Sequence, residues 1–269
     1  MCKNGILCLF LLVSFNVFCQ RNNSENKNEL APEITVQSMA VERYQAFLAK
    51  NIVIELTPDV ELVQKVGNRV IEALKKYYAQ KKRSEELKDF HWEIKMVDKK
   101  DINVWCIPGG KMIVCSGLTG FTQNEASLAV TFTHQIAHVL MKHGNERLKK
   151  SLQEFMGGKT LPEALAAKPA DTRDLFEMAY GMGNHIGVTP PYNIKNEMEA
   201  DKLGLMLTGL AGYNPREALV IWERMSQLSR TARKPELLGL HQVSEERMEE
   251  MEKIMDDMVK NFYKPPHKT

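Results

Sequence analysis

Residues 36–80 carry apolar side chains at intervals of three and four positions. This period predicts two amphipathic helices, at 36–50 and at 58–80. Pro58 suits the first turn of the second helix, because the amide hydrogens of a first turn have no partner within the helix. We expect the apolar faces of both helices to pack into the core.

The period shortens between residues 91 and 117. The segments 91–98, 102–107 and 111–117 alternate in polarity or are apolar throughout, and Pro108, Gly109 and Gly110 separate the last two. Proline followed by glycine is typical of a tight turn. We therefore predict a three-stranded antiparallel sheet with one hairpin. The edge of such a sheet can hold an extended peptide by strand addition.

A helical period returns after residue 122. Thr122 and Glu125 have the spacing of a capping box, which predicts a helix that begins there and continues toward Phe155. Apolar residues cover several of its faces: Ala126, Leu128, Ala129, Val130, Phe132 and Ile136. A helix of this composition is predicted to be central and buried.

The second half of the chain is predicted to be helical with two interruptions. The stretch 157–170 is rich in small residues and proline, and 181–191 has the composition of a loop. Helices are expected at 171–182, from Asn193 onward, at 215–230 and at 243–263. Together with the short sheet, they predict a mostly helical α+β fold in a single domain over 36–265.

Composition and charge exclude some classes of partner. The chain has 269 residues, of which 43% are hydrophobic, so one large core can form. Its 36 basic and 34 acidic residues give a net charge of +2, and we expect no nucleic-acid partner. The basic run at 75–83 lies beside acidic residues and is predicted to be a solvated helix face.

The N-terminal residues have the pattern of an export signal. Lys3 precedes an apolar run at 6–18, and the sequence then becomes abruptly polar. We predict a cleavable signal peptide at 1–19, a polar tether at 20–35 and no stable membrane span in the mature chain. The protein would be periplasmic, secreted or in the secretory-pathway lumen. Cys19 lacks the preceding leucine and small residue of a lipoprotein signal, so lipid anchoring is less favoured.

Two of the five cysteines, Cys106 and Cys115, lie beyond this predicted signal. An oxidising compartment would allow them to pair. A turn centred on Gly109 and Gly110 places them diagonally across the hairpin, which is a poor distance for a disulfide. We therefore expect free, half-buried thiols.

His134 and His138 are four positions apart in the predicted central helix. They share one face, so both imidazoles can approach one metal ion. In zinc peptidase helices of the H-E-x-x-H type, the residue after the first histidine is the glutamate that acts as general base. Gln135 stands there, and a carboxamide cannot accept a proton from a zinc-bound water near neutral pH. The alternative is a pair of histidines that only form hydrogen bonds.

A third ligand is predicted in the helix that begins near Asn193. Glu197 and Asp201 lie four positions apart and share a face, whereas Glu199 points elsewhere. A His-His-Glu zinc site needs one carboxylate ligand, and an acid one turn further on can orient a ligating histidine. We expect Glu197 to be the ligand and Asp201 the orienting acid. The alternative is an acidic, solvated helix face.

Four motifs occur in a fixed order: NVWCIPGGKMIVCSGL, HQIAHVLMKHGNER, EMEADKLGLMLTGLAGYNPREALVIWERM and LHQVSEER. Together they resemble the zinc metallopeptidases of family M forty-eight, which includes HtpX-like, Oma-type and Ste-type CAAX endopeptidases. The resemblance covers about residues 60–260 and is to the soluble exported members. It implies a gluzincin, or zincin-like, domain with a small antiparallel sheet beside the metal helix.

The resemblance also implies roles for individual residues. Zn²⁺ would be held by His134, His138 and Glu197, with Asp201 in support. The hairpin would be the edge that binds substrate, at positions Asn103, Trp105, Pro108, Gly109 and Gly110. His241 and Arg247 would come from the loop and helix that complete the cleft, where a cationic or histidine group stabilises the oxyanion.

This chain departs from the family pattern around the chemistry. Gln135 replaces the glutamate, Asn193-Ile194 replaces Ser-Arg, and Gln242 replaces the proline after His241. A general base contributes a factor of about 100 to 10,000 in rate, or roughly 3–5 kcal/mol. The sequence therefore predicts a zinc-binding protein whose peptidase activity is lost or strongly impaired and which binds unfolded or extended polypeptide. Two alternatives stay open: an active zinc endopeptidase in protein quality control, and a metal-free interaction module.

Overall fold

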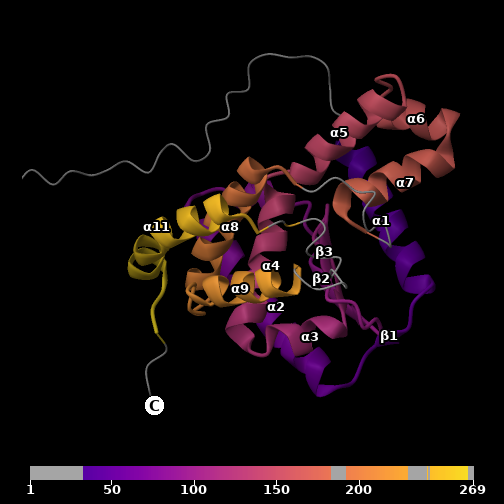
Figure 1. Ribbon diagram of the computed structural model, residues 1–269. Helices are drawn as coiled ribbons and strands as arrows, with labels where there is room; N and C mark the ends of the chain where they lie inside the picture. The colour runs from indigo at the N-terminus through magenta and orange to yellow at the C-terminus, as the bar shows by residue number, and fades with distance from the viewer. Residues whose placement is uncertain (1–32, 183–191, 230–240, 242, 266–269) are drawn as a thin grey trace, which may run out of the picture.

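The computed structural model describes residues 33–182, 192–229, 241 and 243–265 (Figure 1). The predicted signal peptide at 1–19 and the tether residues 20–32 lie outside these described residues, as does most of the predicted loop at 181–191. Within the described residues, no helix is both long enough and apolar enough to cross a membrane.

The fold is mostly helical with one small sheet, as predicted. The first half of the chain contains α1 (Glu33–Ala49), β1 (Val53–Ile54), α2 (Pro58–Gln80), η1 (Ser84–Leu87), β2 (Glu93–Val97), β3 (Val104–Ile107), β4 (Lys111–Cys115), α3 (Gly117–Thr122) and α4 (Glu125–Leu140). The second half contains α5 (His143–Phe155), α6 (Leu161–Ala167), α7 (Pro169–Tyr180), α8 (Ile194–Leu210), α9 (Glu217–Ser229) and α11 (Glu245–Phe262).

The sheet is mixed, with strand order β1-β2-β4-β3. The predicted hairpin is confirmed, because β3 and β4 pair antiparallel with Val104 opposite Val114. The prediction that all strands are antiparallel is wrong, because β2 pairs parallel with β4. Four of the five β4 residues are buried, and so are all four residues of the edge strand β3, so both strands lie inside the fold.

Helices cover both faces of this sheet (Figure 1). Val104, Cys106, Met112 and Val114 belong to a core shared with α2, α4 and α8. Trp105, Ile107, Ile113 and Cys115 belong to a second core shared with α1, α5, α6 and α7. Cys106 and Cys115 thus face opposite sides of the sheet. Neither forms a disulfide, as expected, and both are fully rather than half buried.

The central helix differs from its prediction at both ends. Thr122 ends α3, and the cap of α4 is Asn124, whose side chain accepts a hydrogen bond from Ser127 N at 2.8 Å. The helix does not continue to Phe155, because Lys142 adopts a left-handed conformation with φ of 59° and a new helix, α5, begins at His143. The body of α4 is buried, as predicted.

The other helices begin close to where the pattern predicts. Asn193 caps α8 by accepting from Asn196 N at 2.9 Å, and Ser244 caps α11 by accepting from Arg247 N at 3.2 Å. The expected turn at 157–170 contains the additional short helix α6, whose Thr160 and Glu163 form a capping box. Helix α8 packs along α4 and α11 packs against α8 (Figure 1).

One glycine permits the close contact between α4 and α8. A Cβ atom at Gly204 would lie 3.1 Å from the backbone nitrogen of His134, which is tighter than an ordinary contact. The absence of a side chain there lets the two helix backbones approach each other. The histidines of α4 and the acids of α8 are thereby brought face to face.

Candidate metal centre

Four side chains converge between α4, α8 and the segment before α11. His134 and His138 come from α4, Glu197 comes from α8, and His241 precedes α11. One ligand atom from each lies within 4.8 Å of the others, and all four residues are buried. His134 Nε2 is 3.1 Å from His138 Nε2 and 3.0 Å from His241 Nδ1, while His138 Nε2 is 3.3 Å from a Glu197 oxygen.

These distances and atom types suit a tetrahedral metal ion. Ligand atoms on a tetrahedron with bonds of about 2.0–2.1 Å are separated by about 3.3 Å. The Nδ1 atom of His134 lies 3.0 Å from an Asp201 oxygen, so its proton belongs there and Nε2 presents a lone pair. Lone pairs that face one another at 3 Å repel unless a cation lies between them. The residues present therefore fit a divalent metal.

The protonation equilibria agree with a set of ligands. Burial lowers the pKa of His138 well below its usual value and also lowers the pKa of His241, which keeps both imidazoles neutral. Burial also opposes the charged form of His134, but its hydrogen bonds to Asp201 and Glu197 outweigh burial and raise its pKa. A metal ion would displace the proton on the ligating nitrogen of His134.

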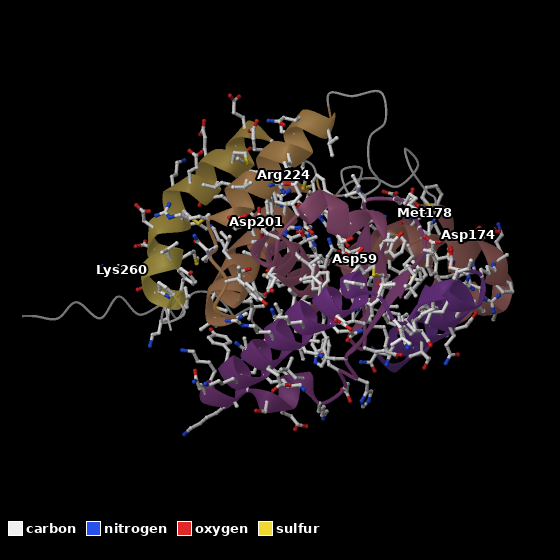
Figure 2. All side chains as sticks on the ribbon, turned by 90° about the horizontal axis from the view of Figure 1, so that it is seen from below. Asp59, Asp174, Met178, Asp201, Arg224 and Lys260 are labelled. Atoms are coloured by element: carbon white, nitrogen blue, oxygen red, sulfur yellow. The ribbon has the colours of Figure 1, made fainter. Side chains whose placement is uncertain are left out.

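Arg247 connects the two carboxylates of α8. It lies 2.6 Å from Glu197 and donates to both oxygens of Asp201, at 2.6 and 2.8 Å, with all three side chains almost fully buried. Burial raises the pKa of both carboxyls, but the guanidinium, together with the neighbouring histidines, outweighs burial and holds both pKa values below their usual range. The structure thus places Arg247 as a partner of both acids. Figure 2 shows Asp201 in the interior, whereas Lys260 on α11 lies at the surface.

Gln135, at the position of the expected base, contacts His241. Its amide nitrogen is 2.9 Å from His241 Nε2, and His241 Nδ1 is 2.9 Å from Glu197. His241 therefore lies inside the ligand group and is not only a residue that completes the cleft. The oxygen and nitrogen of a glutamine amide can exchange places by a flip of the side chain. Gln135 can therefore accept a hydrogen bond from His241 or donate one to it.

Two further residues of the site were missed by the sequence reasoning. His143 Nδ1 lies 3.0 Å from His138 Nδ1, and the ring of Tyr192 lies 4.1 Å from that of His138. Arg147 covers the ring of Tyr192 at 4.3 Å. The histidine spacing H-x-x-x-x-H was visible, but a continuous helix would have turned His143 away. Tyr192 had no signal beyond its place just before Asn193.

The predicted substrate residues lie along the hairpin, whose strand β3 packs beside α4. The Asn103 side chain accepts from Val104 N at 2.8 Å, and Trp105 packs edge-on against Phe47 of α1. The carbonyls of Gly109 and Gly110 accept from His91 N and Glu93 N. Pro108 is buried beside them. The observed contacts of these five residues hold the hairpin, and their role toward a substrate stays a prediction.

A buried His-x-x-x-His helix, packed on a second helix with a glutamate and an aspartate and lying under a small sheet, defines a zincin-like metallopeptidase domain. Residues 63–255 match peptidase family M48, and the chain belongs to this family. The predicted family is thereby confirmed.

Several curated relatives are metalloendopeptidases by name. The chain is 30% identical to mitochondrial metalloendopeptidase OMA1 of Schizosaccharomyces pombe over 52% of its own length and 39% of that protein. It is 28% identical to OMA1 of Arabidopsis thaliana over 53% of its length and 27% of that protein. It is 23% identical to the beta-barrel assembly-enhancing protease of Escherichia coli over 57% of its length and 32% of that protein. The chain thus spans less than half the length of these relatives.

These relatives contradict one prediction. The chain was expected to be exported to the periplasm or through a secretory pathway, but the OMA1 proteins it matches are mitochondrial by name. The expectation of export is therefore wrong on this comparison. It rested on an apolar run in residues that lie outside the described part of the chain.

Proposed function

We propose that the chain binds Zn²⁺ through His134, His138, Glu197 and His241, and that it is an inactive or strongly impaired member of its metallopeptidase family. In this proposal it acts by binding unfolded or extended polypeptide, through a single domain at 36–265. The observation that carries the proposal is the contact of 2.9 Å between Gln135 and His241. The position of the general base is occupied by an amide, and that amide holds a fourth ligand.

Zinc is favoured by the chemistry of the ligands. Three imidazoles and one carboxylate, with tetrahedral spacing, are the nitrogen and oxygen donors that zinc takes in proteins. When bound, the metal would supply a Lewis acid that polarises a carbonyl or a water. Asp201 orients His134, and Arg247 in turn fixes Asp201.

Two features of the protein side argue against efficient hydrolysis. A carboxamide has no proton affinity suited to removing a proton from water near neutral pH, which forfeits roughly 3–5 kcal/mol of barrier lowering. His241 also occupies the fourth position among the ligands, whereas catalytic zinc sites keep one position open for water or substrate. Both features point from catalysis toward a closed, structural metal site.

The edge of β3 supports peptide binding. Asn103 and Ile107 direct backbone carbonyls toward the β4 side of the hairpin, where they accept from Cys115 N and Gly110 N. Backbone groups alternate in an antiparallel pair, so those of Val104 and Cys106 face away from β4. The side chain of Asn103 already satisfies Val104 N. Val104 and Cys106 are 1% and 5% exposed, so an extended peptide would have to uncover this edge before pairing with Cys106 and the carbonyl of Val104.

Cleavage of unfolded casein tests the catalytic part of this proposal. We expect the zinc-loaded wild-type chain to leave casein intact and the double variant Gln135→Glu, His241→Ala, which restores the base and opens the fourth ligand position, to cut it in a chelator-sensitive way. If both cut and a chelator stops both, the chain is an active zinc endopeptidase and another group supplies the base. That alternative is favoured by the complete ligand set and by relatives that are proteases by name.

Binding of labelled, unfolded casein tests the peptide-binding part. We expect wild type to bind it and Cys106→Pro, which removes an outward amide hydrogen at an edge strand, to bind more weakly. Bound zinc, measured on the same samples, controls for folding of the site. Equal binding by both proteins would argue against the β3 edge. Wild type without zinc after supplementation, but with its fold intact, would favour the metal-free interaction module.

A further inference from the structure

The break between α4 and α5 places His143 against a proposed zinc ligand. On a continuous helix, residues five apart point about 140° away from each other. Lys142 interrupts the helix with φ of 59°, and the chain turns His143 back so that its Nδ1 lies 3.0 Å from His138 Nδ1. His143 is only 2% exposed. The contact therefore depends on the break.

Glu199 holds the other side of His143. Its Oε2 atom lies 3.2 Å from His143 Nε2, and its side chain is 32% exposed. Glu199 is two residues from Glu197 and so points away from the four converging ligand atoms. Its other close cation is Lys195, whose Nζ is 4.0 Å away and well exposed. Among these contacts, the path from Glu199 to the metal centre runs through His143 and then His138.

The directions of the hydrogen bonds follow from the ligand geometry. His138 Nε2 faces the other ligand atoms, so its proton is on Nδ1 and is donated to His143 Nδ1. His143 then carries its own proton on Nε2 and donates it to Glu199. Each ring has one defined tautomer. The chain from His138 to Glu199 mirrors the contact of His134 with Asp201 on the other ligating histidine.

We propose that His143 and Glu199 form a positioning pair for His138, which fixes its tautomer and ring orientation for the metal. This inference rests on the proposed zinc binding and adds two residues to it. Histidine ligands commonly donate their second nitrogen to a partner, and loss of that partner typically costs 10–100-fold in metal affinity. The Tyr192 ring, whose centroid lies 4.1 Å from that of His138 at a tilt of 30°, restrains the face of the imidazole while His143 restrains its edge.

Zinc affinity, measured by competition with a chromophoric chelator, tests the pair. We expect His143→Leu to bind zinc about 10–100-fold more weakly than wild type. His143→Gln should recover most of that loss, because its side-chain carbonyl can accept from His138. Glu199→Gln should weaken binding by a smaller factor. The matched control Lys195→Met removes the exposed partner of Glu199 and should bind as wild type does.

Cobalt substitution adds a readout that a change in stability alone would not move. The visible spectrum of the Co²⁺-loaded chain reports the ligand field, and it should shift in His143→Leu and return in His143→Gln. In the double variant His143→Leu, Glu199→Gln, affinity should be no lower than in His143→Leu alone, since both residues act through one chain of bonds. Thermal unfolding of the zinc-free proteins checks that each variant is folded.

Several results would overturn the pair. A zinc affinity in His143→Leu equal to that of wild type would show that His143 does not position His138. A loss of zinc affinity in Lys195→Met equal to that in Glu199→Gln would assign the effect of Glu199 to its surface ion pair. If His143→Leu does not fold, two other results would reject the positioning pair. These are an altered cobalt spectrum in His143→Gln and an unchanged zinc affinity in Glu199→Gln. Failure of wild type to bind zinc is a separate outcome, which rejects the proposed function and this inference together.

Discussion

The amide nitrogen of Gln135 lies 2.9 Å from Nε2 of His241, and the other ring nitrogen of His241 lies 2.9 Å from Glu197. His241 is thus held at both ends, by the residue in the position of the general base and by a carboxylate of the metal centre. A glutamate at position 135 would activate water in an active relative. Here the side chain at that position contacts His241, which is itself a candidate metal ligand.

Zinc affinity should depend on this contact. Gln135→Leu keeps the size of the side chain but removes its hydrogen bond, so His241 loses the partner of its Nε2 atom. We expect zinc binding to weaken about 10–100-fold, as for other lost partners of ligating histidines. His241→Ala should weaken it at least as much. Chelator competition measures both, and wild-type affinity in Gln135→Leu would show that the contact does not hold the ligand.

Arg247 should be essential for stability even without metal. Arg247→Met leaves the carboxylates of Glu197 and Asp201 buried without their cation, and breaking a buried pair in this way costs about 3–5 kcal/mol. Urea unfolding of the zinc-free chain at pH 7 measures the change. The control Arg216→Met removes a pair with Asp256 whose side chains are 50% and 87% exposed, and it should cost less than about 1 kcal/mol.

The pH dependence of unfolding distinguishes this mechanism from a packing defect. Because Arg247 holds the pKa values of Glu197 and Asp201 below their unfolded values of about 4, the stabilisation is complete above that pH and is lost as pH falls through the folded values. The stability difference between wild type and Arg247→Met should therefore narrow below pH about 4. A difference that is constant from pH 7 to the acid range would indicate lost packing.

Gly204 should be sensitive to the smallest possible side chain. In Gly204→Ala, the new methyl would lie 3.1 Å from His134 N and 3.2 Å from its Cα, and these backbone atoms cannot move independently of α4. We expect a loss of about 1–3 kcal/mol of stability and weaker zinc binding, because α8 must move from α4. Gly120→Ala is the control, since nothing lies within 4 Å of its added methyl. Equal effects of the two variants would refute the role of close helix packing.

The thiols should be inert in the folded protein. Burial raises the pKa of Cys106 to about 12, so almost no thiolate forms near pH 8, and Cys115 is also buried. Iodoacetamide at pH 8 should leave both unmodified in the native chain and label both in urea. Peptide mass spectrometry reads each site. Rapid labelling of the native protein, or a Cys106–Cys115 disulfide, would contradict the assignment to opposite faces of the sheet.

The local pattern of the sequence determined the elements and the pairs of functional residues within them. Periodicity alone places His134 with His138 on one helix face and Glu197 with Asp201 on another, because four residues make about one turn. It also identified the hairpin between β3 and β4 and the starts of α2 and α8. These are properties of neighbouring residues, so they can be read without knowing how the chain packs.

Tertiary structure alone decided which of these elements meet. The position of β4 between β2 and β3 depends on its parallel pairing with β2, a contact between distant segments that no local spacing specifies. Nothing about Lys142 indicated a left-handed residue, yet that single dihedral angle brings His143 to His138. His241 reaches Gln135 from 106 positions away because α11 packs on α8 and α8 packs on α4. Contacts between distant residues depend on the total burial of the folded chain, and for this reason the sequence pattern could not predict them.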